Sequence, residues 1–139
     1  MKKYQLLVVL ILFVSIISTV SYSDTFWGAV FLDYKEAKKK WGDIEFNASK
    51  FKSADEKEKG AMAANAIKIK MFVGKDMLEV RKELGVPNSY FFSDTIFAYA
   101  ITESSENKEA WHLIFVPDEK LEKVKEVKIH KKCCYKSPL

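Results

Sequence analysis

Few side chains in this sequence are suited to acid–base or metal chemistry, and their spacing does not bring them together. The chain has two histidines, His112 and His130, which the hydrophobic pattern assigns to two different strands. Neither forms, with cysteines or carboxylates, the ligand spacing of a zinc site, so we predict no metal centre. His112 stands between Trp111 and Leu113 and is expected to point outward from its strand.

Motifs for nucleophilic catalysis and for phosphate binding are also missing. No serine lies within a G-x-S-x-G sequence, and the five glycines are too scattered to form a phosphate-binding loop. The carboxylates of DEKEK and PDEKLEK stand at helix starts and turns, where charged runs are usually solvated. The sequence therefore predicts a protein that is not an enzyme and that uses no cofactor.

The two cysteines, Cys133 and Cys134, are adjacent in the chain. Neighbouring cysteines form a disulfide only through a strained small ring, because their Cα atoms are closer than an ordinary disulfide requires. A redox enzyme of the thioredoxin kind needs the spacing C-x-x-C, which these residues lack. A vicinal disulfide, an intermolecular bridge and two free thiols all remain compatible with the sequence.

Residues 1–23 have the pattern of a secretory signal peptide. The basic start MKK precedes an uncharged apolar run over residues 4–20, and Ser21 and Ser23 supply the small side chains that favour cleavage before Asp24. An uncleaved membrane anchor is the alternative, because about 17 apolar residues are at the lower limit for crossing a bilayer. Both interpretations predict an exported protein.

The overall charge excludes one class of partner. The formal net charge of +4 falls to +2 without the two lysines of the leader, which is too small to predict nucleic-acid binding. Basic side chains are concentrated in KVKEVKIHKKCCYK, where we expect an exposed edge strand that its lysines protect from pairing with other chains. The alternative is contact with anionic lipid headgroups. The residues predicted for that contact are Lys128, His130, Lys131 and Lys132.

The rest of the chain divides into an extension, a domain and a tail. Residues 24–52 are rich in aromatic side chains but weakly periodic, and we expect an extended segment that these side chains fasten to the main domain. One short helix is expected within it, at DYKEAKKKW. The main domain is predicted over residues 53–132, and residues 133–139 form the tail. The chain length suits one small domain.

The first helix of the main domain is predicted from a capping box. Ser53 is followed three residues later by Glu56, and good helix formers come next. Gly60 is expected to weaken or break this run. Apolar residues at helical spacing in AMAANAIKIKMF then predict a helix that ends near Met71.

The stretch GKDMLEVRKELGVP predicts a second, short helix with defined ends. Asp76 is a suitable N-cap. One apolar stripe contains Met77, Val80 and Leu84. Gly85 stands where a left-handed residue ends a helix, and the proline that follows prevents continuation. A helix of about nine residues is not stable alone in water, so it must pack on another element.

Three alternating segments predict strands, namely TIFAYAIT, AWHLIFV and VKEVKIHK. The polar connectors ESSENKE and PDEK suit hairpins between them. In the first segment Phe97, Tyr99 and Ile101 share one side. On the other side lie Ile96, Ala98 and Ala100. The sequence therefore predicts an α+β two-layer sandwich in which two helices pack on a three-stranded antiparallel meander.

The order of these elements, with the motif F-V-G-K-D-x-x-E-V-R-K-x-L-G-x-P, resembles the small outer-membrane protein A family, also called BamE or OmlA, over about residues 60–129. The resemblance implies a periplasmic or outer-membrane-associated location and an accessory role in outer-membrane protein assembly or envelope integrity. Two departures are the missing lipoprotein cysteine after the leader and the extension over residues 24–52. The matched residues, such as Gly74, Val80 and Gly85, determine the fold and do not name a partner.

Two function hypotheses follow from these patterns. The first is a non-enzymatic envelope protein that binds a protein partner, and anionic lipid as a further partner, through an exposed sheet face or edge and the basic C-terminal strand. The second is a secreted inhibitor module that occupies a partner's cleft with its open sheet face, as the architecturally similar β-lactamase inhibitor proteins do. Both predict exposed aromatic side chains opposite the helices, where they would carry much of the binding energy. The candidates are Phe97, Tyr99 and Trp111.

Overall fold

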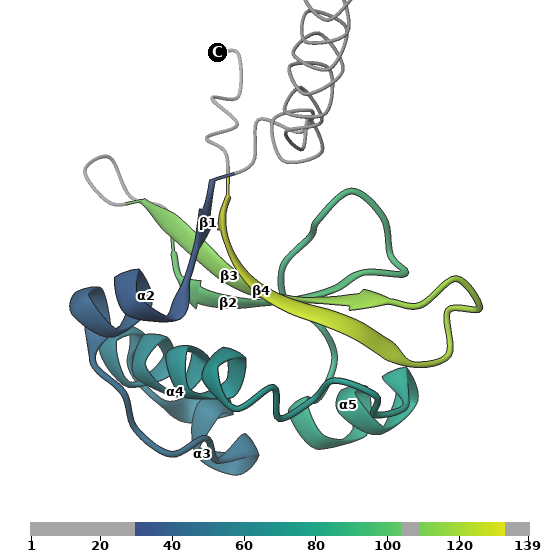
Figure 1. Ribbon diagram of the computed structural model, residues 1–139, viewed down its shortest axis with the longest axis horizontal. Coiled ribbons are helices and arrows are strands. Elements are labelled where there is room, and N and C mark those ends of the chain that lie inside the picture. Colours follow the sequence, from purple (N-terminus) through teal and green to yellow (C-terminus); the bar gives the residue numbers. More distant parts are fainter. Residues whose placement is uncertain (1–29, 104–108, 133–139) are drawn as a thin grey trace, which may run out of the picture.

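The computed structural model describes residues 30–103 and 109–132. Four helices lie on one side of a four-stranded antiparallel sheet, so the predicted two-layer α+β arrangement is confirmed with additional elements (Figure 1). The elements in chain order are β1 (Phe31–Leu32), α2 (Tyr34–Trp41), α3 (Ala48–Ser53), α4 (Glu56–Lys68), α5 (Met77–Leu84), β2 (Phe97–Thr102), β3 (Ala110–Pro117) and β4 (Val124–Lys132). Within the described ranges, no helix is both long enough and apolar enough to cross a membrane.

The three predicted strands form the expected meander, and β1 adds a fourth strand beside β4. The strand order is β1-β4-β3-β2, with Phe31 opposite His130 and Leu32 opposite Ile129. The amide of Lys131 also donates to the carbonyl of Val30 at 2.8 Å. The prediction that the basic C-terminal strand is a sheet edge is therefore wrong where β1 pairs with it, at Ile129 and His130.

Helix α5 has the ends and the buried stripe that its sequence predicts. Asp76 is the N-cap and its carboxylate accepts from the amide of Leu78 at 2.8 Å. Met77, Val80 and Leu84 are the buried residues of the helix. Gly85 has φ +83°, which L side chains rarely adopt, so the helix ends there. The short helix is held by packing and by bonds to the sheet.

Helix α4 differs from its prediction at two points. Its N-cap is Asp55, which accepts from the amide of Glu58 at 2.8 Å, in place of the predicted Ser53. The helix also continues through Gly60 without a break. Trp41 of α2 packs directly on that position. A Cβ at Gly60 would lie 2.3 Å from the indole ring, so the glycine permits a close crossing of α2 and α4. The helix ends at Lys68, slightly before the predicted limit.

The described part of the extension is more regular than predicted, and its aromatic side chains enter the core as expected. Trp41, Phe46 and Phe51 are all buried. The ring of Phe46 packs edge-on against Phe72 at 5.1 Å, and Phe72 packs in the same way against Phe115 of β3 at 5.1 Å. This row of rings connects the extension to the sheet, so residues from both belong to one hydrophobic core.

The two faces of the sheet have different covers. The face with large side chains packs against the helices, and it carries Tyr99, Ile101, Trp111, Leu113, Phe115 and Ile129. Residues 86–96, which connect α5 to β2, pass the outer edge of β2 and then loop over the side of the sheet opposite the helices (Figure 1). We call this segment the aromatic loop. Beneath it, Ala98 and Ile114 are 0% exposed, so the second face is also closed in its middle.

Candidate functional site

The predicted aromatic surface does not exist, because its three residues face the helices. Tyr99 and Trp111 are only 3% and 4% exposed, and Phe97 is half-buried against the core. The indole of Trp111 packs edge-on against Trp41 at 6.0 Å. The physical reason is that helices gain most by covering the face with the larger apolar area, which leaves the alanines of β2 on the other face.

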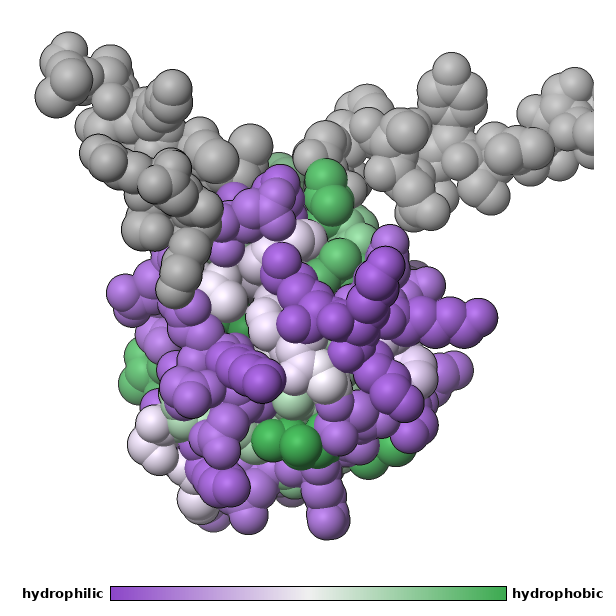
Figure 2. All heavy atoms as spheres, turned by 90° about the vertical axis from the view of Figure 1, so that its left-hand side faces the viewer, coloured by the Kyte–Doolittle hydropathy of each residue, from purple (hydrophilic) through white to green (hydrophobic). Residues whose placement is uncertain are grey.

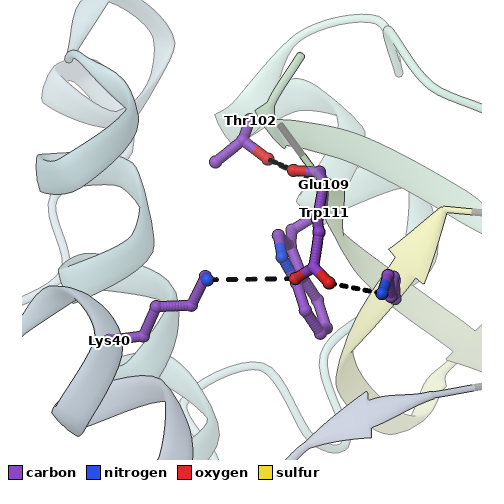
Figure 3. A network of polar contacts seen from close by, with 5 residues as sticks. Lys40, Thr102, Glu109 and Trp111 are labelled. Atoms are coloured by element: carbon purple, nitrogen blue, oxygen red, sulfur yellow. Dashed lines mark hydrogen bonds and ion pairs between the residues drawn. The ribbon is translucent and has the colours of Figure 1, made fainter. Parts of the chain in front are cut away.

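The predicted lipid-contact residues do not share one face either. Lys131 lies on the side of Trp111, and its Nζ is 2.5 Å from Glu109 Oε1. Lys40 of α2 approaches the other oxygen of Glu109 at 4.0 Å, and Thr102 donates to the Glu109 carbonyl at 2.8 Å (Figure 3). The hydrogen bond from Lys131 lowers the pKa of Glu109, so the charge of Lys131 is matched locally.

The other members of that set lie on the loop side of β4. Lys128 places its Nζ over the ring of Phe31 at 4.7 Å and 3.2 Å from a carboxylate oxygen of Glu126. Lys132 is exposed, whereas His130 is only 8% exposed and cannot be a surface contact. Lys128 and Lys132 therefore share one side of β4, and Lys131 lies on the other. Cys133 and Cys134 lie outside the described residues.

The loop-covered face contains a hydrogen-bonded pair of buried histidines, which we call the histidine pair. His112 and His130 are direct partners on β3 and β4, and Nε2 of His112 lies 2.7 Å from Nδ1 of His130. The Oγ of Ser89 lies 2.9 Å from Nδ1 of His112. His112 lies on the face away from the helices, but it is 1% exposed, so the expectation that it points outward is wrong.

Burial keeps both imidazoles uncharged near neutral pH. Desolvation lowers the pKa of His112 to about 4, and the positive potential of His130 and Lys132 adds to the effect. Burial also lowers the pKa of His130. At a nitrogen–nitrogen distance of 2.7 Å one ring donates and the other accepts, which requires one hydrogen between them.

The aromatic loop is fastened to the sheet through this pair. The ring of Phe91 packs against His130 at 4.5 Å and against His112 at 5.9 Å, and Phe31 packs against His130 at 5.1 Å. The amide of Ser89 donates to the carbonyl of Ala98 at 3.0 Å. Beside it, the side chain of Asn88 accepts from the amide of Ala100 at 2.8 Å. These bonds also cover the outer edge of β2.

The outer surface of the loop presents two aromatic side chains. Tyr90 is 57% exposed and Phe92 is 52% exposed, on either side of the anchored Phe91. The hydroxyl of Tyr90 donates to the carbonyl of Phe92, and the rings of Phe91 and Phe92 pack edge-on at 4.7 Å. Phe92 has φ +57°, an uncommon conformation for a bulky side chain that costs on the order of 1–3 kcal/mol. The surroundings therefore impose the loop conformation.

The chemistry available at this site is limited. A serine hydroxyl beside a histidine nitrogen is the arrangement of a nucleophile and a general base. Here the lowered pKa of His112 makes it a weak base, and its other ring nitrogen already contacts His130. Within residues 30–103 and 109–132, no three histidine, cysteine, aspartate or glutamate side chains are grouped so that they could hold a metal ion. We interpret Ser89 and the histidine pair as a buried polar anchor.

Sequence reasoning missed this site because it treated the two histidines separately. A hairpin centred on Leu121 pairs residues at equal distances from that centre, which places His112 opposite His130. The predicted connector PDEK, residues 117–120, is centred between Asp118 and Glu119 and would have placed Lys125 opposite His112, so it did not give that register. The aromatic run Tyr90 to Phe92 was not singled out either, although three consecutive aromatic residues directly after a helix end were a usable signal.

The chain matches no protein-family model, no curated protein and no solved structure. The resemblance to the small outer-membrane protein A family thus stays a prediction.

Proposed function

We propose that this chain is a non-enzymatic interaction protein of the cell envelope that binds a protein partner through the aromatic loop. One observation carries the proposal: Tyr90 and Phe92 are more than half exposed, while Phe91 between them is anchored on the histidine pair. The envelope location rests on the leader pattern of residues 1–23 and on the family resemblance.

The loop has the properties of a preorganised contact. Exposed aromatic side chains supply much of the binding energy of protein interfaces. Holding them in one geometry before binding reduces the conformational entropy that association must remove. Ser89, Phe91 and the hydroxyl of Tyr90 all restrict the loop, and the positive φ of Phe92 indicates that its geometry is maintained against its own preference.

Among the residues that the structure describes, the side of the molecule that carries α2 offers no stronger candidate for a binding surface. Figure 2 views the side of the molecule that carries α2, where hydrophilic residues dominate and hydrophobic ones form only small separate patches. Scattered apolar side chains of that kind are normal for a soluble surface and do not mark a binding site. Consecutive aromatic residues on one fastened loop are the stronger candidate.

The inhibitor alternative and the lipid alternative are both less well supported. An inhibitor of the β-lactamase-inhibitor kind uses an open sheet face, whereas Ala98, His112 and Ile114 of the corresponding face are buried here. Lipid contact through the basic strand needs its lysines on one side, whereas Lys131 faces away from Lys128 and Lys132.

The test is affinity capture from the native envelope after crosslinking, followed by binding measurements with the purified captured protein. The double variant Tyr90→Ser/Phe92→Ser should weaken binding at least tenfold, because two central aromatic contacts typically contribute more than about 1.4 kcal/mol together. Leu78→Ser is the matched control, since Leu78 is 72% exposed on α5. Equal binding by the wild type and the loop variant would contradict the proposal, and capture of one soluble enzyme would favour the inhibitor module.

A further inference from the structure

We propose that mild acid releases the aromatic loop from the sheet, because the histidine pair that anchors it accommodates one added proton but not two. The inference rests on the proposed function, since the loop is the proposed binding surface, and it assigns a regulation to that surface. It depends on the positions of Ser89, His112, His130 and Phe91.

In the neutral pair, both nitrogens of His112 and Nδ1 of His130 are hydrogen-bonded. In one arrangement the Ser89 hydroxyl donates to Nδ1 of His112, and Nε2–H of His112 donates to Nδ1 of His130. An added proton binds at Nδ1 of His112, and the Ser89 hydroxyl turns to accept from it. The first proton therefore breaks no hydrogen bond, and its cost is the placement of a charge in a buried site.

A second proton has a different effect. With both imidazoles protonated, two N–H groups face each other across 2.7 Å and two positive charges share one buried site. The contact between His112 and His130 cannot persist in that state. Because Phe91 packs on both rings, separation or hydration of the rings removes the platform on which the loop is held.

The surroundings of the pair do not offset the added charge. From β4, Glu126, Lys128 and Lys132 lie on the same side as His130. Glu126 is paired with Lys128 at 3.2 Å, and Lys132 disfavours a cation on His112. The parts of β1 and β2 packed nearby are Phe31, Ala98 and Ala100, which are uncharged. The loop contributes the phenol of Tyr90 and the carboxylate of Asp94, which lines a surface hollow of about 190 Å³ together with Ser89. No hydrogen bond or ion pair of the described residues joins a carboxylate to either imidazole.

The direction of the pH effect follows from proton uptake. In the closed state burial lowers the pKa of His112 to about 4, and in a released loop the pKa returns toward the ordinary 6.5. Below pH 6.5 the open state takes up protons on both imidazoles, whereas the closed state takes up the first one only near pH 4 and excludes the second, so falling pH favours the open state. Between pH 7 and pH 5 the ratio of open to closed loop should rise by about tenfold or more.

The experiment is hydrogen exchange of the isolated wild-type protein at pH 7 and pH 5, with each rate divided by its intrinsic rate. The amides of Ser89 and Ala100, which bond to Ala98 and Asn88, report on the loop, and α4 is the internal reference. The expected result is a protection ratio of loop to helix that falls at least tenfold from pH 7 to pH 5. An unchanged ratio would overturn the inference.

The matched variant is His112→Gln/His130→Asn, in which two side-chain amides replace the facing ring nitrogens and neither titrates. Its loop protection should be the same at both pH values, and retention of the wild-type pH dependence would overturn the inference. Should this variant not fold, an NMR titration of the wild-type imidazoles replaces it: the loop amides should change with the same midpoint as a histidine, and independent midpoints would contradict the link.

These measurements separate the inference from the proposed function. They use the isolated protein, so they do not depend on a partner. An acid-sensitive loop whose Tyr90→Ser/Phe92→Ser variant binds the captured protein normally would overturn the proposed function alone. A loop of constant protection that is nevertheless required for binding would overturn only the acid release.

Discussion

The two faces of the sheet are buried in different ways, and the difference separates stability from function. On the helix face large rings such as Phe72 and Phe115 interdigitate within one continuous core. On the loop face the strands contribute Ala98, Ile114 and the histidine pair, and a single loop rests on the histidine pair through Phe91. A face closed by several helices opens only with the whole domain, whereas a face closed by one loop can open locally.

The largest expected effect is on the helix face. Phe115 and Ile114 are neighbours on β3, both 0% exposed, and they point to opposite faces. Phe115→Ala should lower the free energy of unfolding by about 3–5 kcal/mol, because it leaves a cavity among rings that cannot collapse. Ile114→Ala should lower the free energy of unfolding by about 2 kcal/mol, near the lower end of the range for such substitutions. The loss is smaller because the loop can move into the space that the side chain leaves. Urea unfolding measures both, and an equal loss would remove the distinction between the faces.

The next effect tests how closely the helix layer is packed. Gly60→Ala places a Cβ about where the ring of Trp41 lies, at 2.3 Å. We expect a loss of about 1–3 kcal/mol, because either the indole or the helix crossing must shift. Lys57→Ala is the control on the same helix and should stay within about 0.5 kcal/mol. Thermal unfolding distinguishes the two, and a neutral Gly60→Ala would show that the crossing adapts without cost.

The pH dependence of stability should have a separate window for each face. On the loop face burial lowers the pKa of His112 to about 4, so stability is complete above the ordinary pKa of 6.5 and decreases as the pH falls from there. The expected loss is on the order of 2 kcal/mol by pH 5. On the helix side, hydrogen bonds from Tyr34, Asn65 and Lys68 lower the pKa of Asp43 far below 3.8, so its contribution is lost only in stronger acid. Urea midpoints that stay constant from pH 7 to pH 5 would contradict the first window.

A smaller effect is expected from the serine that anchors the loop. Ser89→Ala removes the partner of His112 Nδ1 and leaves a buried nitrogen without a hydrogen bond. The cost should be about 1 kcal/mol and should affect the exchange of the loop more than that of α4. Ser93→Ala is the control, because the Ser93 hydroxyl contacts the hydroxyl of Thr95 at an exposed position of the same loop. Equal exchange in both variants would mean that the contact to His112 does not hold the loop.

The sequence predicted most of the helix face and little of the loop face, for physical reasons. Local sequence patterns predicted two features of the helix face correctly. One is the alternation of Phe97, Tyr99 and Ile101, and the other is the N-cap and apolar stripe of α5. Local rules could not decide which face of β2 the helices cover, since that depends on the apolar area summed over three strands. They also assigned Gly60 the average tendency of glycine to weaken a helix. In the structure a glycine is needed there because the ring of Trp41, a residue in a different helix, occupies the space of a side chain. The histidine pair required the register of β3 and β4, which the separate readings of His112 and His130 did not use.

The most direct test of the separation between the faces is native-state hydrogen exchange of the variant Phe91→Ala at pH 7. Phe91 is the half-buried residue that joins the aromatic loop to both imidazoles. If the loop opens on its own, exchange of the Ser89 and Ala100 amides rises by about tenfold or more while α4 keeps its wild-type protection. If protection of α4 falls in step with that of the loop, the two faces form one cooperative unit and the account is contradicted.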